Sequence, residues 1–192
     1  MSVGGANKNE LPDLSDEWRK AISEADILLL QRSVPQPMNV LAAKYARAAG
    51  TKVLLDMGGA DVPMDPELME NVDIISPNNT ELNRILDFEK NSSLDEKITV
   101  FMKRYPGTDI LFKRGADGAT YFANKQYHHM DASINNVEEG VYDLTERSAV
   151  NFDSHEGIEL VDTTGAGDCF TAAFAVAQLE DKTIEESLEF AC

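Results

Sequence analysis

Short apolar runs alternate with longer amphipathic stretches over residues 26–112. The apolar runs predict strands at residues 26–31, 51–56, 72–76 and 108–112, and the first of these is expected to be fully buried. Between them, apolar positions recur at helical spacing in residues 38–49, 66–70, 79–88 and 94–105. Strands that alternate with helices of this length are typical of βαβ units. The pattern predicts a three-layer α/β fold with a mainly parallel sheet.

Three more helices are predicted outside this alternation. Residues 16–25 form an amphipathic helix whose apolar anchor is Trp18, packed on the edge of the sheet. Residues 169–179 are strongly helical, and a last helix begins near Thr183. A short strand over residues 158–161 is expected before the first of these two C-terminal helices.

The alternation stops between Tyr121 and Glu159. Residues 131–160 contain eight acidic residues and one basic residue, Arg147. Such a stretch is typical of a solvated connection, so we expect residues 131–157 to form an acidic, flexible insertion. A calcium-binding loop is the alternative, although the acidic spacing does not follow the EF-hand pattern.

Charge and composition narrow the classes of partner. The 34 acidic residues against 17 Lys and Arg give a net charge of −17, which disfavours nucleic acid and anionic membrane surfaces. The longest apolar run, Ile27 to Leu30, is too short to span a bilayer. The two cysteines, Cys169 and Cys192, fit a reducing compartment, and a cytoplasmic location is expected.

The strongest chemical signal is the string Asp162-Thr-Thr-Gly-Ala-Gly-Asp168, which leads directly into the helix predicted at residues 169–179. A Gly-Ala-Gly turn at a helix N-terminus leaves backbone N–H groups available to an anion. Asp168 would then lie beside that anion, where it could accept a proton from a hydroxyl that attacks a phosphorus atom. The alternative is that Asp168 only stabilises the dipole of its own helix.

Four other segments accompany this string along the chain. They are Gly5-Ala-Asn7, Gln31-Arg-Ser-Val-Pro35, Ser76-Pro-Asn-Asn-Thr-Glu81 and Lys113-Arg-Gly-Ala-Asp-Gly118. Together with the string they resemble the ribokinase-like, or PfkB-type, carbohydrate kinase family, closest to its ribokinase branch. The resemblance covers essentially the whole chain.

The resemblance implies a Rossmann-like core and an enzyme that transfers the γ-phosphate of ATP to a sugar hydroxyl. Ribose is the first candidate for the acceptor, so ATP and a small sugar are the expected partners. Asp168 matches the catalytic base of the family. The amides of Gly165, Ala166 and Gly167 match its anion hole, which stabilises charge during transfer.

The resemblance also implies sites for the nucleotide and for two cations. Positions matched to nucleotide binding are Asn78, Lys113, Gly115 and Gly118. Asn78 and Glu81 match residues that hold Mg²⁺ through water, and Asp162 with Thr164 matches a site for an activating K⁺. Taken by itself, Asn78 is equally well explained as a helix cap that forms a capping box with Glu81.

The chain departs from the family pattern in two ways. Ser33 stands where ribokinases have a glutamate that contacts the sugar. The family's sugar-binding segment and lid sheet normally precede Gly5, and its chain continues beyond the last helix. We therefore expect residues 1–192 to be a single partial kinase core without the lid sheet, with a homodimer expected only where the lid is present.

Two other function classes stay open at this point. One is a catalytically incomplete fragment or a non-catalytic nucleotide-binding protein built on the same core. The other is a kinase for a different sugar or for a nucleoside.

Overall fold

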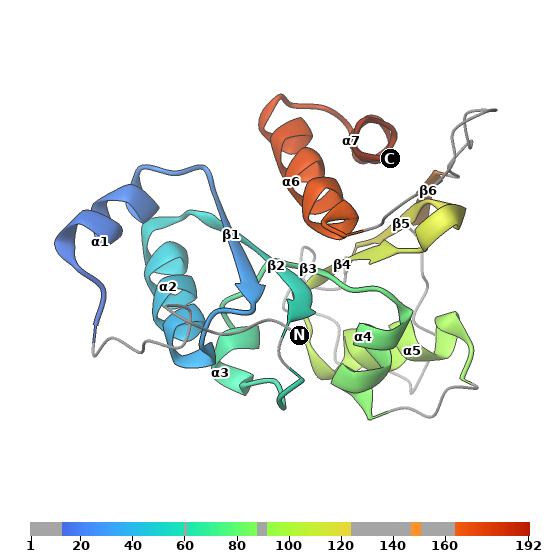
Figure 1. Cartoon of the computed structure of the whole chain (residues 1–192), viewed down its shortest axis with the longest axis horizontal. Helices are drawn as coiled ribbons and strands as arrows, with labels where there is room; N and C mark the ends of the chain where they lie inside the picture. Colours follow the sequence, from blue (N-terminus) through green and yellow to red (C-terminus); the bar gives the residue numbers. More distant parts are fainter. Residues whose placement is uncertain (1–12, 60, 88–91, 124–146, 151–163) are drawn as a thin grey trace, which may run out of the picture.

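One sheet of six strands organises the molecule, in the spatial order β1-β2-β3-β4-β5-β6. The computed structural model describes residues 13–59, 61–87, 92–123, 147–150 and 164–192 (Figure 1). The strands are β1 (Ile27–Arg32), β2 (Lys52–Gly59), β3 (Ile74–Ser76), β4 (Asp109–Lys113), β5 (Ala119–Phe122) and β6 (Arg147–Val150). The first four run parallel, and β5 and β6 are antiparallel to their neighbours. The expected α/β fold with a mainly parallel sheet is confirmed.

Helices cover both faces of this sheet (Figure 1). Consecutive parallel strands always step in the same direction, so right-handed crossovers place their connecting helices on one face. That layer contains α2 (Gln36–Ala49), α3 (Pro66–Met69), α4 (Asn79–Leu86) and α5 (Leu94–Arg104), with α1 (Asp16–Ser23) packed beside α2. The opposite face is covered by α6 (Ala166–Leu179) and α7 (Ile184–Ala191).

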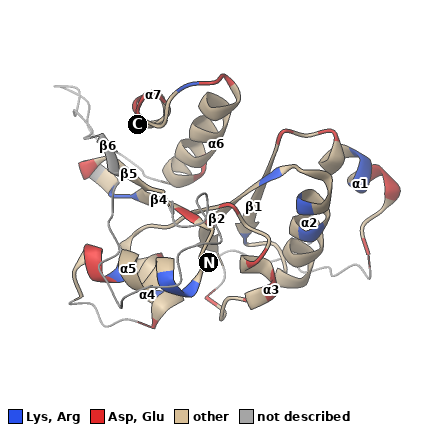
Figure 2. Cartoon of the chain, turned by 180° about the vertical axis from the view of Figure 1, so that it is seen from behind, with Lys and Arg blue, Asp and Glu red and all other residues tan. Residues whose placement is uncertain are grey.

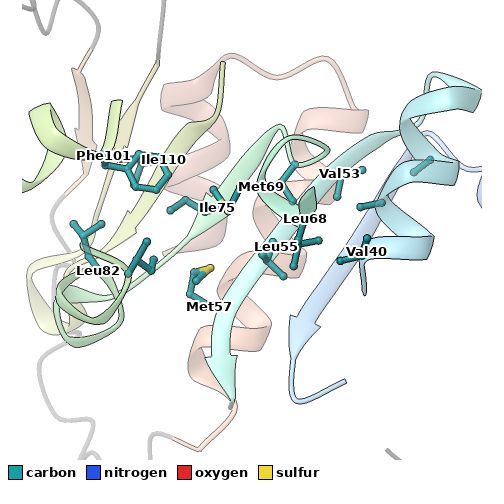
Figure 3. Packing of buried hydrophobic residues seen from close by; sticks show 14 of the residues in the cluster. Val40, Val53, Leu55, Met57, Leu68, Met69, Ile75, Leu82, Phe101 and Ile110 are labelled. Atoms are coloured by element: carbon teal, nitrogen blue, oxygen red, sulfur yellow. The ribbon is translucent and has the colours of Figure 1, made fainter. Parts of the chain in front are cut away.

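The alternation of side chains along β2 divides the core between the two faces. Val53, Leu55 and Met57 point into the larger apolar cluster, which packs against the layer of α2 to α5 (Figure 3). Leu54 belongs instead to the smaller cluster beneath α6 and α7. The next residue on that second face is Asp56, so β2 carries a polar side chain directed towards α6.

Most helix boundaries agree with the sequence prediction because local signals set them. Gly50 adopts a φ of +83° and ends α2, as predicted. Capping boxes begin α4 at Asn78, α5 at Ser93 and α7 at Thr183.

Three expectations for the N-terminal half were wrong. β1 pairs only with β2 among the described strands, and Leu29 is 44% exposed, so β1 is not fully buried. Trp18 is 59% exposed, whereas Leu14 and Ile22 provide the buried contacts around α1. β2 continues through Gly59, beyond residue 56 where the predicted strand ended.

β4 was predicted, but β5, which forms a hairpin with it, and β6 were not. β5 follows the turn Gly115–Asp117, and β6 pairs with β5 in antiparallel register. β6 lies within residues 131–157, the expected acidic insertion, whose other residues lie outside the described part of the chain. The expected strand over residues 158–161 also lies outside the described residues.

Acidic residues occur in both helical layers, for example in the first turns of α5 and α7 (Figure 2). Within the described residues, no helix combines the length and apolar character that a membrane crossing needs.

Gly59 provides a test of how tightly the ends of β1 and β2 pack. Replacing Gly59 with alanine is expected to lower the free energy of unfolding by about 3 kcal/mol. Gly59 has a φ of +119°, and an added Cβ would lie 2.5 Å from the backbone nitrogen of Ser33. Gly50→Ala is the matched control, because Gly50 also has positive φ but no atom lies within 4 Å of the added Cβ. In urea unfolding, the free energy of unfolding of Gly50→Ala should fall by only about 1 kcal/mol. An equal fall for Gly59→Ala and Gly50→Ala would contradict the close packing of the two strand ends.

Candidate functional site

The carboxyl ends of the parallel strands place three polar residues in one row. Gln31 of β1 is directly opposite Asp56 of β2, and Asp56 is directly opposite Ser76 of β3. Lys113 ends β4, the next strand of the sheet. In parallel α/β sheets, ligands bind at the carboxyl ends of the strands.

The N-terminus of α6 lies at this row. Gly165 precedes the helix with a φ of +80°, a conformation that glycine adopts readily, and no described side chain caps the first turn. The first backbone N–H groups of α6 are therefore without helical partners and can bind an anion. This is the turn predicted from the sequence to form the anion hole.

Two side chains of α6, one turn apart, bond to the row. The Asp168 Oδ1 atom accepts a hydrogen bond from the Gln31 side-chain amide at 3.0 Å. Thr171 is buried, and its hydroxyl donates to Asp56 Oδ2 at 2.8 Å. A hydroxyl has one proton, so Ser76 must be the donor in its 2.9 Å contact with Thr171.

Asp56 is a buried carboxylate that accepts hydrogen bonds from three donors. Its Oδ2 atom accepts from Lys113 Nζ at 2.8 Å as well as from Thr171. Its Oδ1 atom accepts from the backbone N–H of Gly58 at 2.7 Å. A carboxylate that is 6% exposed needs such partners, because burying an unpaired charge is costly.

Lys113 lies between the first turn of α6 and two carboxylates. Besides its bond to Asp56, its Nζ is 3.8 Å from Glu81 Oε2. A Cβ built on Gly167 would lie 3.4 Å from the same Nζ, so the ammonium lies directly against the first turn of α6. The side chain is 14% exposed, which excludes the solvated strand-end position that a lysine commonly takes.

Asn78 and Glu81 form the capping box of α4. Asn78 Oδ1 accepts from the Glu81 backbone N–H at 2.9 Å, and Glu81 Oε2 accepts from the Asn78 N–H at 2.7 Å. Among the described residues, no hydrogen bond to Glu81 Oε1 is found. One carboxylate oxygen fits a Mg²⁺ ion held partly through water, since Mg²⁺ in phosphate sites keeps several waters. The cap and the expected magnesium role are therefore compatible.

A cleft of about 390 Å³ opens next to these residues. It is lined by Asn78, Asn79, Thr80, Leu94, Phe112, Lys113, Arg114, Gly115 and Asp117. Three of the residues matched to the nucleotide thus share one cavity. The fourth, Gly118, lies in the same β-hairpin, where its N–H bonds to the Gly115 carbonyl at 3.1 Å.

The expected potassium site is only partly within the described chain. Thr164 is exposed immediately before Gly165, and Asp162 lies outside the described residues. Where side chains are described, no cluster of three or more His, Cys, Asp or Glu could hold a metal.

A buried cation also lies close to the site on the other face of β1. Arg32 is 7% exposed, and its guanidinium donates to the Val62 carbonyl. Burial lowers the pKa of Arg32, while the nearby carboxylates of Asp61 and Glu81 act in the opposite direction.

The structure brings together most of the site residues predicted from the sequence, at the strand ends and the start of α6. Asp56, Ser76 and Thr171 were not predicted as site residues. A carboxylate at the end of the buried strand predicted at residues 51–56 was the available signal for Asp56. Nothing local marks Thr171, because its partner lies 115 positions away.

Comparison with known proteins gives consistent matches over the full chain. Residues 1–192 match the model of the pfkB family carbohydrate kinase. The chain is 36% identical over 191 residues to the ribokinase of Arabidopsis thaliana, covering 98% of this chain and 45% of that protein. It is 28% identical over 190 residues to the ribokinase of Lactococcus lactis, covering 98% and 52%.

Solved structures include a similar fold. The structure of the Arabidopsis thaliana ribokinase complexed with ribose and ATP matches with a TM-score of 0.81 and 34% identity. The match covers 100% of this chain and 55% of that chain. This chain spans about half the length of the curated relatives it matches.

The ion pair between Lys113 and Asp56 can be tested by removing the lysine charge. Lys113→Met is expected to lower the free energy of unfolding by about 3–5 kcal/mol, because it leaves the buried Asp56 carboxylate without its counter-charge. Lys44→Met is the matched control, since Lys44 pairs with Glu67 where both side chains are half exposed. Urea unfolding should show a much smaller decrease in the free energy of unfolding for Lys44→Met. Similar losses for the two variants would contradict the central position of the buried pair.

Proposed function

Because the chain belongs to the pfkB family of carbohydrate kinases, we propose that it transfers the γ-phosphate of ATP to a hydroxyl of a small sugar, with ribose as the acceptor. The observation that carries the proposal is the position of Asp168 at the start of α6. Its carboxylate is exposed in the same helical turn whose backbone amides can hold an anion. The Arabidopsis relative solved with ribose and ATP supports both substrates.

In the proposed reaction, Asp168 is the general base. It takes the proton of the sugar hydroxyl as the hydroxyl oxygen bonds to the γ-phosphorus, and the bond from that phosphorus to the bridging oxygen breaks to release ADP. The amides at Gly165, Ala166 and Gly167 donate to the phosphoryl oxygens, where negative charge must be stabilised. An uncapped helix N-terminus suits this role because its donors are already oriented.

The nucleotide is proposed to lie along the cleft beside Asn78, Lys113 and Gly115. Glu81 Oε1 would hold Mg²⁺ through water, and the ion supplies charge neutralisation on the phosphates when bound. Lys113 contributes a second positive charge, fixed by Asp56 against the anion hole. Thr164 and Asp162 are proposed to hold the activating K⁺.

The proposal requires an assay in which the whole sugar site is present, because the chain spans about half the length of its relatives. We therefore consider two samples: residues 1–192, and a chimaera in which they replace the 191 matching residues of the Arabidopsis ribokinase. With ATP, Mg²⁺, K⁺ and ribose, the chimaera should release ADP at about 1–100 s⁻¹. The isolated chain should be a poor kinase, because the attacking hydroxyl must be held in line in a water-excluded site. A folded, ATP-binding chimaera without ribose-dependent turnover would overturn the proposal.

Removing the proposed base should separate catalysis from nucleotide binding. Asp168→Asn in the chimaera is expected to lower kcat by about 10²–10⁴-fold, while the KM for ATP changes little. Asp181→Asn is the matched control, since it makes the same change just beyond the other end of α6. Turnover of the Asp168 variant within a few-fold of the parent would exclude the assignment.

The cation site predicts a dependence on the monovalent ion. With Mg²⁺ saturating, replacing Na⁺ by K⁺ should raise the ribose-dependent rate of the chimaera. Asp162→Asn should reduce this activation without abolishing turnover in Na⁺, whereas Thr164 is expected to contribute a backbone oxygen that a side-chain substitution keeps. An unchanged rate on exchange of the two ions would remove the K⁺ assignment and leave that of Asp168 standing.

A further inference from the structure

The side chain of Gln31 is hydrogen-bonded at both ends of its amide. Its Nε2 atom donates to Asp168 Oδ1 at 3.0 Å, and its Oε1 atom accepts from the Ser33 hydroxyl at 2.5 Å. A carboxylate can only accept, so the amide nitrogen must face Asp168 and the amide oxygen must face Ser33. The contacts therefore fix one of the two orientations that a glutamine amide can take.

The backbone of Gln31 is held as firmly as its side chain. Its carbonyl accepts from the side-chain amide of Asn39, a residue of α2 that is 2% exposed, and from the Val34 N–H. The register between β1 and β2 shifts immediately after Gln31, where Arg32 pairs with Gly59. A glycine is needed there because a Cβ would collide with the backbone of Ser33. Two strands and one helix thus determine where the Gln31 amide lies.

Asp168, in contrast, is exposed and lies at a helix end, so its carboxylate would otherwise rotate between conformers. Among the described residues, the side chain that bonds to this carboxylate is that of Gln31. The bond uses Oδ1 and leaves Oδ2 for an incoming hydroxyl.

We propose that Gln31 is a positioning residue of the phosphoryl-transfer site: it holds the Asp168 carboxylate in one orientation, and Ser33 locks the Gln31 amide for this task. The proposal deepens the kinase function proposed above and rests on it. It also gives Ser33 a role in this chain, because its hydroxyl is committed to Gln31. Gln31 acts through Asp168 and takes no proton itself.

The contact can be tested in residues 1–192 without any activity, by the side-chain amide resonances of ¹⁵N-labelled protein. The Gln31 amide proton should lie downfield of those of exposed Asn and Gln side chains, because it is bonded to a carboxylate. Asp168→Asn should move this resonance and leave that of Gln178 unchanged, because Gln178 lies at the other end of α6 and its amide bonds to Ser187 of α7. Ser33→Ala should shift the Gln31 amide resonance by less than Asp168→Asn does. A Gln31 resonance whose position is unchanged by Asp168→Asn would overturn the proposal.

The positioning role can be tested in the chimaera with Gln31→Met, which keeps the length of the side chain and removes its donor. We expect kcat to fall by about 10- to 100-fold with the KM for ATP within two-fold, since misplacing a reacting group costs this much. Gln178→Met is the matched control and should keep kcat. In the Asp168→Asn background, Gln31→Met should lower kcat by less than two-fold more, because its effect passes through Asp168.

These outcomes separate the two proposals. A chimaera that does not turn over, or whose turnover is unchanged by Asp168→Asn, contradicts the kinase function. The amide resonance of Gln31 still reports the contact with Asp168 in that case. Two results contradict the positioning role alone. One is a Gln31→Met variant with the kcat of the parent, and the other is a decrease in kcat that is as large in the Asp168→Asn background as in the parent. A loss confined to the KM for ATP would also contradict it, because Asp168 acts on the acceptor hydroxyl.

Discussion

The buried carboxylate of Asp56 is the group on which the arrangement of this molecule depends. A charge in that position is tolerable only when its partners are complete, because the cost of burying it otherwise exceeds the gain from any one contact. Lys113 of β4, Thr171 of α6 and the backbone of Gly58 supply these partners. Three segments that are distant along the chain must therefore meet at one point, and that point is the carboxyl end of the sheet.

The position of α6 follows from this requirement. The face of the sheet that α6 covers is apolar at Leu54, Ile74 and Leu111, which would allow a helix to slide. The hydrogen bonds of Asp168 and Thr171 to the row at the strand ends fix its register. The N-terminus of α6 is consequently held above the strand ends, where its first turn lies against Lys113, a residue that also lines the cleft. The site and the docking of the helix have the same cause.

The sequence predicted those parts of the fold that depend on neighbouring residues. Gly50 ends a helix and Ser93 begins one, whatever the remainder of the chain does. The burial of β1 could not be read from its apolar run, because exposure depends on whether a second strand pairs beside it. The bond between Asp56 and Thr171 was equally hidden, since no local pattern relates residues 115 positions apart. Gln31 was recognised only as part of a motif, and its contact with Asp168 emerged from the fold.

The two aspartates of the site differ in what their surroundings allow them to do. Asp56 has both oxygens engaged and is closed to solvent, so it can hold Lys113 but has no place for a substrate proton. Asp168 is exposed and bonded through one oxygen, so it can accept a proton without losing its support. If the two residues exchanged surroundings, the roles would exchange as well. The number of hydrogen bonds that each carboxylate already accepts therefore explains why the base of the proposed reaction lies on the helix, and why its counterpart on the sheet serves the structure.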